Sequence, residues 1–290
     1  LRRDFHRHPE PAFQEERTAE VVAAYLRDLG LPLQTGIART GVVALIEGKK
    51  SGRTLLLRAD MDALPIEEAN EIDYRSQVPG IMHACGHDGH TAVLLGAARV
   101  LAEKKDRLAG NVKLVFQPAE EKPGGALPMI EEGILENPKV DAALAQHLAM
   151  MLPIGQIGVR PGPVFASTDE FRITVLGKGG HGGMPHETVD PIVCAARVVE
   201  ALQTLVSREC HPAKALVVSI GRIAGGQTFN VIPDSVELGG TVRTYDTALR
   251  QSMEERVRRV VKGTTEAAGA DYQLDYRYLY PPLVNDTDMS

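Results

Sequence analysis

The chain has 290 residues, enough for one large domain or two smaller ones, and its formal net charge at pH 7 is −6. No basic stripe is present, which argues against a general nucleic-acid binder, and no apolar run is long enough to span a bilayer. The three cysteines are scattered and odd in number, so we expect no disulfide framework. The acidic composition and the lack of a visible signal peptide predict a cytoplasmic protein. Because the chain begins at Leu1 rather than Met, we also expect a trimmed or partial sequence.

The first half of the chain alternates expected strands with expected helices. Short apolar runs predict buried strands, and apolar residues at helical spacing predict helices. This alternation indicates an α/β fold in which helices sandwich a mainly parallel sheet. The expected strands are 42–46, 54–57, 112–116 and 142–145, and the expected helices are 15–29, 91–104 and 125–132.

The pattern changes after the Pro-Gly-Pro sequence at 161–163. From there the expected order is strand, helix, strand, strand, helix, strand, which is typical of a ferredoxin-like α+β fold. We therefore predict that a second, smaller domain is inserted after the first. Its expected strands are 171–176, 216–223, 235–243 and 272–276, and its expected helices are 191–206 and 249–268.

The segment 83–90, with the sequence HACGHDGH, is the most informative stretch. Cys85 and His87 are two positions apart, which is metal-ligand spacing, and a helical run follows. Taken alone, a cysteine is more often a small buried hydrophobe, and a histidine is more often a structural residue. The metal-binding interpretation becomes the more plausible one only when further candidate ligands fall at matching positions in the fold.

Such candidates follow the next two expected strands. Glu120 and Glu121 come after the strand 112–116, and His147 comes after 142–145. Ligands bind at the ends of strands in open α/β sheets, so these side chains and the 83–90 segment predict one site. Thiolate, imidazole and carboxylate groups suit Zn²⁺ and related ions, and their spread over three loops favours a catalytic site. On an extended segment one glutamate could bind metal while its neighbour acts as general base.

Four further residues are candidates that also have a structural interpretation, and for Asp60 and Asp62 the two interpretations are about equally plausible. Asp60 and Asp62 follow the strand 54–57 and could bind metal, orient a ligand histidine or simply cap a turn. His181 lies in a glycine-rich loop that could approach a ligand closely, and it could stabilise an oxyanion. Asn230 lies in a similar loop. On spacing alone, a flexible surface turn is the likelier interpretation of both loops.

Together these motifs resemble the M20 metallopeptidases, in the amidohydrolase branch of hippurate hydrolases, N-acyl-amino-acid amidohydrolases and auxin-conjugate hydrolases. The resemblance covers nearly the whole chain. It rests on RRDFHRHPE (2–10), RADMDALP (58–65), HACGHDGH (83–90), QPAEE (117–121), GHGGMPH (180–186) and NVIP (230–233).

The resemblance implies a two-metal catalytic domain at 1–164, with 279–290 beginning its C-terminal return, and a lid domain at 165–278 that forms a homodimer. It implies two divalent ions per subunit, Zn, Mn or Co, and hydrolysis of N-acyl amino acids or similar small conjugates. Asp60 stands where many other branches have a ligand histidine. The implied roles are metal ligands for Cys85, His87, Glu121 and His147, general base for Glu120, support of the site for Asp62, oxyanion contact with the partner's site for His181 and substrate binding for Asn230.

Two other hypotheses remain open at this stage. In the family a further ligand histidine comes after the lid, whereas no histidine follows His211 here, so the chain could be a truncated, inactive homologue that dimerises or binds. Alternatively, Cys85 could be a nucleophile with His87 as its base, although two positions apart in a loop is poor geometry for that pair.

Overall fold

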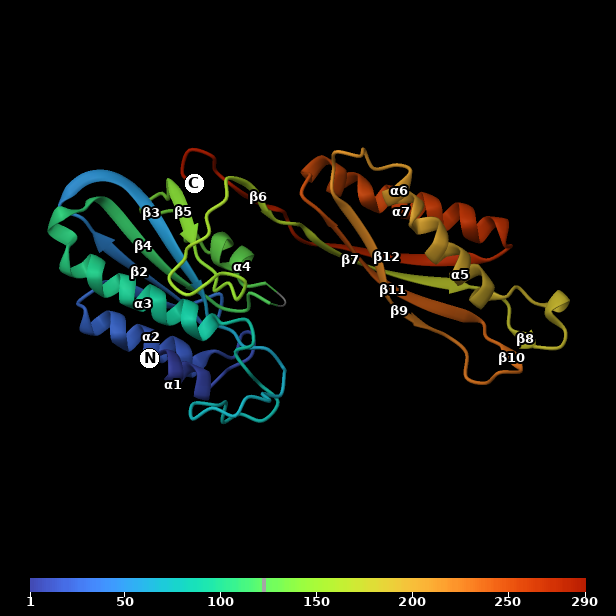
Figure 1. The fold of residues 1–290 in the computed structure, drawn as a ribbon, viewed down its shortest axis with the longest axis horizontal. Helices are drawn as coiled ribbons and strands as arrows, with labels where there is room; N and C mark the ends of the chain where they lie inside the picture. Colours follow the sequence, from blue (N-terminus) through green and yellow to red (C-terminus); the bar gives the residue numbers. More distant parts are fainter. Residues whose placement is uncertain (122–123) are drawn as a thin grey trace. The chain divides into compact units, whose positions relative to one another are not determined.

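The computed structural model describes residues 1–121 and 124–290, which form two compact units, Leu1–Ile154 and Gly155–Ser290 (Figure 1). Within the described residues, no helix is long and apolar enough to cross a membrane.

The first unit is built on a five-stranded sheet with the order β1-β2-β4-β3-β5. β4 pairs in parallel with β3, and β3 pairs in parallel with β5, whereas β1–β2 and β2–β4 are antiparallel. The sheet is therefore mixed, and the prediction of a mainly parallel sheet is wrong in this respect. The strands are β1 (Leu33–Ile37), β2 (Gly41–Glu47), β3 (Lys50–Asp60), β4 (Ala109–Gln117) and β5 (Ala142–Ala145).

The connections explain why the sheet is mixed. Only three residues join β1 to β2, and so short a link can return the chain only in the opposite direction. From β3 to β4 the chain instead crosses over through a long helix, which is what a parallel pair requires. The apolar pattern of the sequence does not predict β1, because only the end residues of this strand are partly buried.

Helices cover both faces of this sheet (Figure 1). One core cluster joins Phe5, Leu26 and Leu95 from α1, α2 and α3 to the strand residues Val42 and Leu114. A second, smaller cluster lies against α4 on the other face. Because both faces are buried, β2 reads as a continuous apolar run. The helices are α1 (Arg2–Arg7), α2 (Glu16–Asp28), α3 (His87–Glu103), α4 (Ala126–Glu131) and the short 3-10 helix η1 (Lys105–Arg107).

The second unit has an antiparallel four-stranded sheet with the order β12-β7-β11-β9 and the expected chain order of strands and helices. In β7 alternate residues are buried, because one face of the sheet packs against α5 and α7. The expected helix 191–206 is interrupted at Gln203 and forms two pieces. The elements are β7 (Thr168–Leu176), α5 (Pro191–Leu202), α6 (Thr204–Ser207), β9 (Leu216–Ala224), β11 (Ser235–Thr244), α7 (Thr247–Ala267) and β12 (Asp271–Tyr280).

Two small ribbons complete the second unit. β8 (Gly180–His181) pairs with β10 (Val231–Ile232), and the 3-10 helix η2 (Pro185–Glu187) follows β8. β6 (Gly162–Phe165) pairs with β13 (Leu283–Asn285), so the two ends of this unit are hydrogen-bonded to each other. These two-stranded ribbons are too short to show a periodic pattern in the sequence.

Candidate metal centre

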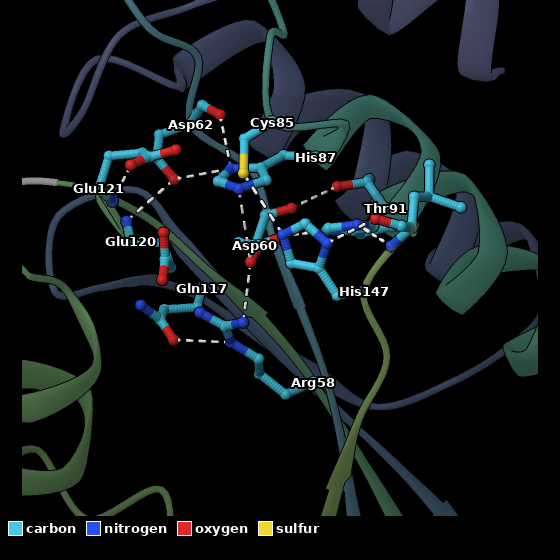
Figure 2. Close-up of polar contacts among 12 residues, drawn as sticks. Arg58, Asp60, Asp62, Cys85, His87, Thr91, Gln117, Glu120, Glu121 and His147 are labelled. Atoms are coloured by element: carbon cyan, nitrogen blue, oxygen red, sulfur yellow. Dashed lines mark hydrogen bonds and ion pairs between the residues drawn. The ribbon is translucent and has the colours of Figure 1, made fainter. Parts of the chain in front are cut away.

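The candidate ligands of the first unit meet at one edge of its sheet (Figure 2). β3 ends at Asp60 and β4 ends at Gln117, and these two residues are paired in parallel register. His87 is the first residue of α3, rather than part of the preceding loop as expected, and His147 follows β5 by two residues. The expectation that strand ends would bring these residues together is therefore met by the fold.

Among residues 1–121 and 124–290, three sets of side chains offer donor atoms within 4.8 Å of one another. The first is Cys85 with His87 and His147, and the second is His87 with Glu120 and Glu121. A third contains Asp60, His87 and His90. His87 belongs to all three sets, so its imidazole lies at the centre of the cluster.

A thiol and an imidazole form one side of this cluster. The Sγ atom of Cys85 is 3.3 Å from Nε2 of His147. Nδ1 of His147 is 2.8 Å from the carbonyl oxygen of Leu148, so Nδ1–H donates there and the Nε2 lone pair faces the thiol. Two soft donors thus point at one volume, which suits Zn²⁺ and related ions.

The surroundings of His87 engage one ring nitrogen and leave the other available to a metal ion. Its ring is 1 % exposed, and Nδ1 is 2.8 Å from the carbonyl oxygen of Asp62. Its Nε2 atom is buried and has no hydrogen-bond partner among residues 1–121 and 124–290. An unsatisfied buried nitrogen costs about 1–3 kcal/mol, a cost that a divalent ion bound at Nε2 removes. The donor set therefore fits a metal ion.

Charges around His87 favour its protonated form when no metal is bound. Burial opposes the charge, but the nearby Asp62 and Cys85 side chains and the negative charge of Asp60 raise the pKa of His87 to about 11. Burial likewise opposes ionisation of Asp60, yet the hydrogen bond from His90 and the charge of Arg58 hold its pKa below the ordinary value. A strong local negative potential is what a cation site requires.

Asp60 also fixes the segment that carries His147. Its Oδ1 accepts from Nδ1–H of His90 at 2.6 Å, and Nε2 of His90 accepts the main-chain N–H of Leu148 at 2.9 Å. Arg58 donates to the other carboxylate oxygen at 2.8 Å. Since both ring nitrogens of His90 are occupied, we infer that His90 orients its neighbours, even though it lies in one of the three sets.

Asp62 fixes the two adjacent glutamates. Its carboxylate accepts the main-chain N–H of Glu120 at 2.9 Å and that of Glu121 at 3.0 Å. The glutamates lie in a turn, so the expectation of an extended segment is wrong, although both side chains still belong to the cluster. Burial raises the pKa of Glu120, with opposing effects from Arg58. Asp62 therefore caps this turn, as one interpretation of its position predicts.

A glycine separates the two ligand candidates at 85 and 87. Gly86 has φ of +85°, in the left-handed region that L residues rarely adopt. A Cβ atom there would also lie 3.2 Å from Cδ1 of Leu148. Glycine therefore lets the chain turn sharply from Cys85 into the first turn of α3.

His181 and Asn230 belong to the second unit, where the β8–β10 ribbon brings them together. Gly182 N–H donates to the Asn230 carbonyl at 2.8 Å, and a Cβ on Gly182 would meet that carbonyl at 2.8 Å. Nδ1 of His181 accepts the N–H of Gly183 at 2.9 Å, so Nε2 carries the ring proton. Both side chains are exposed.

The α/β fold and its metal-ligand cluster define a member of a peptidase family. The family described as Peptidase family M20/M25/M40 matches residues 56–290, and the chain belongs to it. The N-acyl-L-amino acid amidohydrolase of Geobacillus stearothermophilus is 45% identical over 285 residues, covering 98% of this chain and 76% of the relative. The N-acetylcysteine deacetylase of Bacillus subtilis is 42% identical over 287 residues, covering 99% and 75%.

A solved structure agrees in fold. The Bacillus subtilis YXEP protein, described as a dinuclear metal binding peptidase from the M20 family, is 39% identical. It has a TM-score of 0.84, and the match covers 99% of this chain and 74% of that one. The resemblance predicted from the motifs is thereby confirmed.

The structure adds contacts that the sequence did not single out. His90 and Arg58 lie inside recognised motifs, and the i, i+3 spacing of His87 and His90 on a helix could have indicated a shared face. Glu15 and Thr40 gave no signal, because their partners are far away in the sequence.

Proposed function

We propose that this chain hydrolyses the amide bond of N-acyl amino acids with a water molecule activated by divalent metal ions. The observation that carries the proposal is the buried Nε2 of His87, which makes no hydrogen bond within the described residues and lies near a thiol–imidazole pair and a glutamate pair. The relatives named as an N-acyl-L-amino acid amidohydrolase and an N-acetylcysteine deacetylase support this substrate class.

Four residues would hold the metal: Cys85, His87, Glu121 and His147. Two ions per subunit are proposed because the thiol–imidazole pair and the glutamate pair each offer donors near His87, and the dinuclear Bacillus subtilis relative supports this number. When bound, the ions polarise the substrate carbonyl and make a water molecule acidic enough to supply hydroxide near neutral pH. The mixed thiolate, imidazole and carboxylate set suits Zn²⁺, Mn²⁺ or Co²⁺.

Glu120 is proposed as the general base. Its carboxylate would take the proton of the attacking water and deliver it to the nitrogen of the leaving amine. Burial, the main cause of its raised pKa, moves the group toward the range in which a carboxylate exchanges protons near neutrality. Asp62 would keep Glu120 in place by holding the two adjacent amides.

Residues 165–278 are proposed as a lid that forms a homodimer, with 1–164 as the catalytic domain. Because Nε2 of His181 carries the ring proton, this exposed histidine can donate a hydrogen bond to an oxyanion in the site of the partner subunit. Asn230, beside it on the ribbon, would contact the substrate. Sedimentation analysis of the whole chain tests the dimer, and a concentration-independent monomer would exclude it. A cytoplasmic location stays a prediction from composition.

The two rival hypotheses have less support. A non-catalytic binding protein is not favoured, since the relatives at 42–45% identity carry hydrolase names. A nucleophilic Cys85 would use the nearby imidazoles as bases, but it leaves the two glutamates without a role. Chelation separates these mechanisms: EDTA abolishes turnover if Cys85 binds metal, whereas only alkylation does so if it is a nucleophile.

The adjacent glutamates provide a matched pair for testing the proposal. In Glu120→Gln we expect turnover of N-acetyl amino acids to fall on the order of 10³-fold or more, with metal content unchanged, because only the base is removed. In Glu121→Gln we expect loss of bound metal, measured by elemental analysis after dialysis. Loss of metal in Glu120→Gln, or near-normal turnover in that variant, would overturn the assignment.

A further inference from the structure

The N-terminal segment contacts the chain directly beside several site residues. The carbonyl of Glu10 accepts the N–H of Ala63, the residue after Asp62, at 2.8 Å. The carboxylate of Glu15 accepts the N–H of Ala119, the residue before Glu120, at 2.8 Å. The family match begins at residue 56, so these contacts come from a part of the chain outside it.

Glu15 is a buried carboxylate with several partners. Its side chain is 0 % exposed and sits at the start of α2. Oε1 accepts the N–H groups of Phe13 at 3.0 Å and of Ala119, and Oε2 accepts the hydroxyl of Thr40 at 2.6 Å. A buried carboxylate is costly unless it is hydrogen-bonded, so these contacts are the reason it is tolerated in this position.

The amide that Glu15 holds belongs to a strained residue. Ala119 has φ of +50°, which costs an L residue roughly 1–2 kcal/mol, and it is fully buried. Its carbonyl also accepts from Gly125 N–H at 2.8 Å. The surroundings must therefore enforce this conformation, and the fixed acceptor on its N–H is one of the groups that do so.

Three consecutive main-chain N–H groups thus donate hydrogen bonds to two buried carboxylates. Ala119 N–H is held by Glu15, and the N–H groups of Glu120 and Glu121 are held by Asp62. The two carboxylates come from separate parts of the chain and approach the turn through different amides. Asp62 alone leaves the amide of Ala119 unanchored, so the start of the turn, next to Glu120, depends on Glu15 as well.

We propose that Glu15 is a positioning residue, which acts through the main chain of Ala119 to aim the carboxylate of Glu120 at the metal centre. This inference rests on the proposed function, in which Glu120 is the base. A displacement of about 1 Å at a reacting group can cost on the order of 10²-fold in rate, so one remote hydrogen bond is enough to matter.

Two substitutions of Glu15 distinguish the effect of its side-chain length from the effect of its charge. In Glu15→Gln the amide oxygen can accept both main-chain N–H groups while its NH₂ donates to the Thr40 hydroxyl, so we expect near-normal kcat. In Glu15→Asp the charge stays but the side chain is one methylene shorter and loses Ala119. There we expect kcat to fall on the order of 10²-fold, with KM and metal content nearly unchanged. Thr40→Val is the matched control, since it removes a contact to the same carboxylate and leaves the amide contacts in place.

Amide hydrogen exchange gives a readout independent of activity. The segment ending at Glu121 should exchange faster in Glu15→Asp than in the wild type, and at the wild-type rate in Glu15→Gln and Thr40→Val. Normal exchange and kcat in a folded Glu15→Asp would overturn the inference, as would equal loss of kcat in Thr40→Val. If Glu120→Gln stays active, the proposed function fails, but the exchange result still decides whether Glu15 positions this turn.

Discussion

Protonation of His87 in the metal-free chain is the most quantitative consequence of the site. Nδ1 of this ring lies 2.8 Å from the Asp62 carbonyl and 3.3 Å from Asp62 Oδ1, and Nε2 lies 3.7 Å from Asp60 Oδ2. Asp60 and Asp62 have lowered pKa values and are ionised at neutral pH. The imidazolium is thus surrounded by negative oxygen atoms, which outweigh the penalty of burial.

The expected effect is large. With a pKa of about 11, His87 is more than about 99% protonated at pH 8, whereas an ordinary histidine with a pKa near 6.5 is about 3% protonated. The assay is ¹⁵N NMR of the metal-stripped chain with labelled histidine, from pH 6 to pH 9. The sequence contains nine histidines, and we expect the signal of the His87 ring to stay doubly protonated at pH 8. His87→Gln should remove that signal, and His181→Gln should keep it.

The raised pKa of His87 makes both the stability of the metal-free chain and its metal affinity depend on pH. The folded-state pKa is raised, so the contribution of His87 to apo stability is complete below about pH 6.5 and is lost as pH rises through about 11. Metal binding must displace this proton, so apparent metal affinity should rise about tenfold per pH unit for that proton between pH 6 and 8. If every histidine ring has lost its second proton by pH 8, the electrostatic account of the site is refuted.

Two more predictions concern folding and ligand geometry. Lys113 is buried, and its ammonium donates to three main-chain carbonyls. Lys113→Met should therefore lower the free energy of unfolding, measured by urea denaturation, by about 3 kcal/mol or more. An unchanged denaturation midpoint would contradict this expectation. Gly86→Ala forces a Cβ into the left-handed region at a cost of roughly 1–2 kcal/mol. It should therefore weaken metal binding in chelator competition, while Gly96→Ala in the open middle of α3 should not.

Much of the architecture could be predicted from local pattern. Apolar runs located β2 and β4, and helical periodicity located α2 and α7, because each of these elements buries one defined face or two. The apolar run 142–145 also located β5, although this strand is mostly exposed. Strand ends also indicated where Cys85, His87 and His147 would gather, and the motifs identified the family. The sequence could not predict whether strands pair in parallel or antiparallel, since this depends on which strands become neighbours. In this sheet β4 lies between β2 and β3, although it follows both in the chain.

The sequence by itself determined the candidate ligands, since their chemistry is a property of residue type and their spacing follows from the strand and helix pattern. Only the tertiary structure decided how those ligands are held. Glu15 meets Ala119 across 104 positions, and Asp62 meets Glu120 and Glu121 across nearly 60, and no local pattern encodes such contacts. Hydrogen bonds between distant segments arise when the sheet and helices close around a common core, so their partners become visible only in the folded chain.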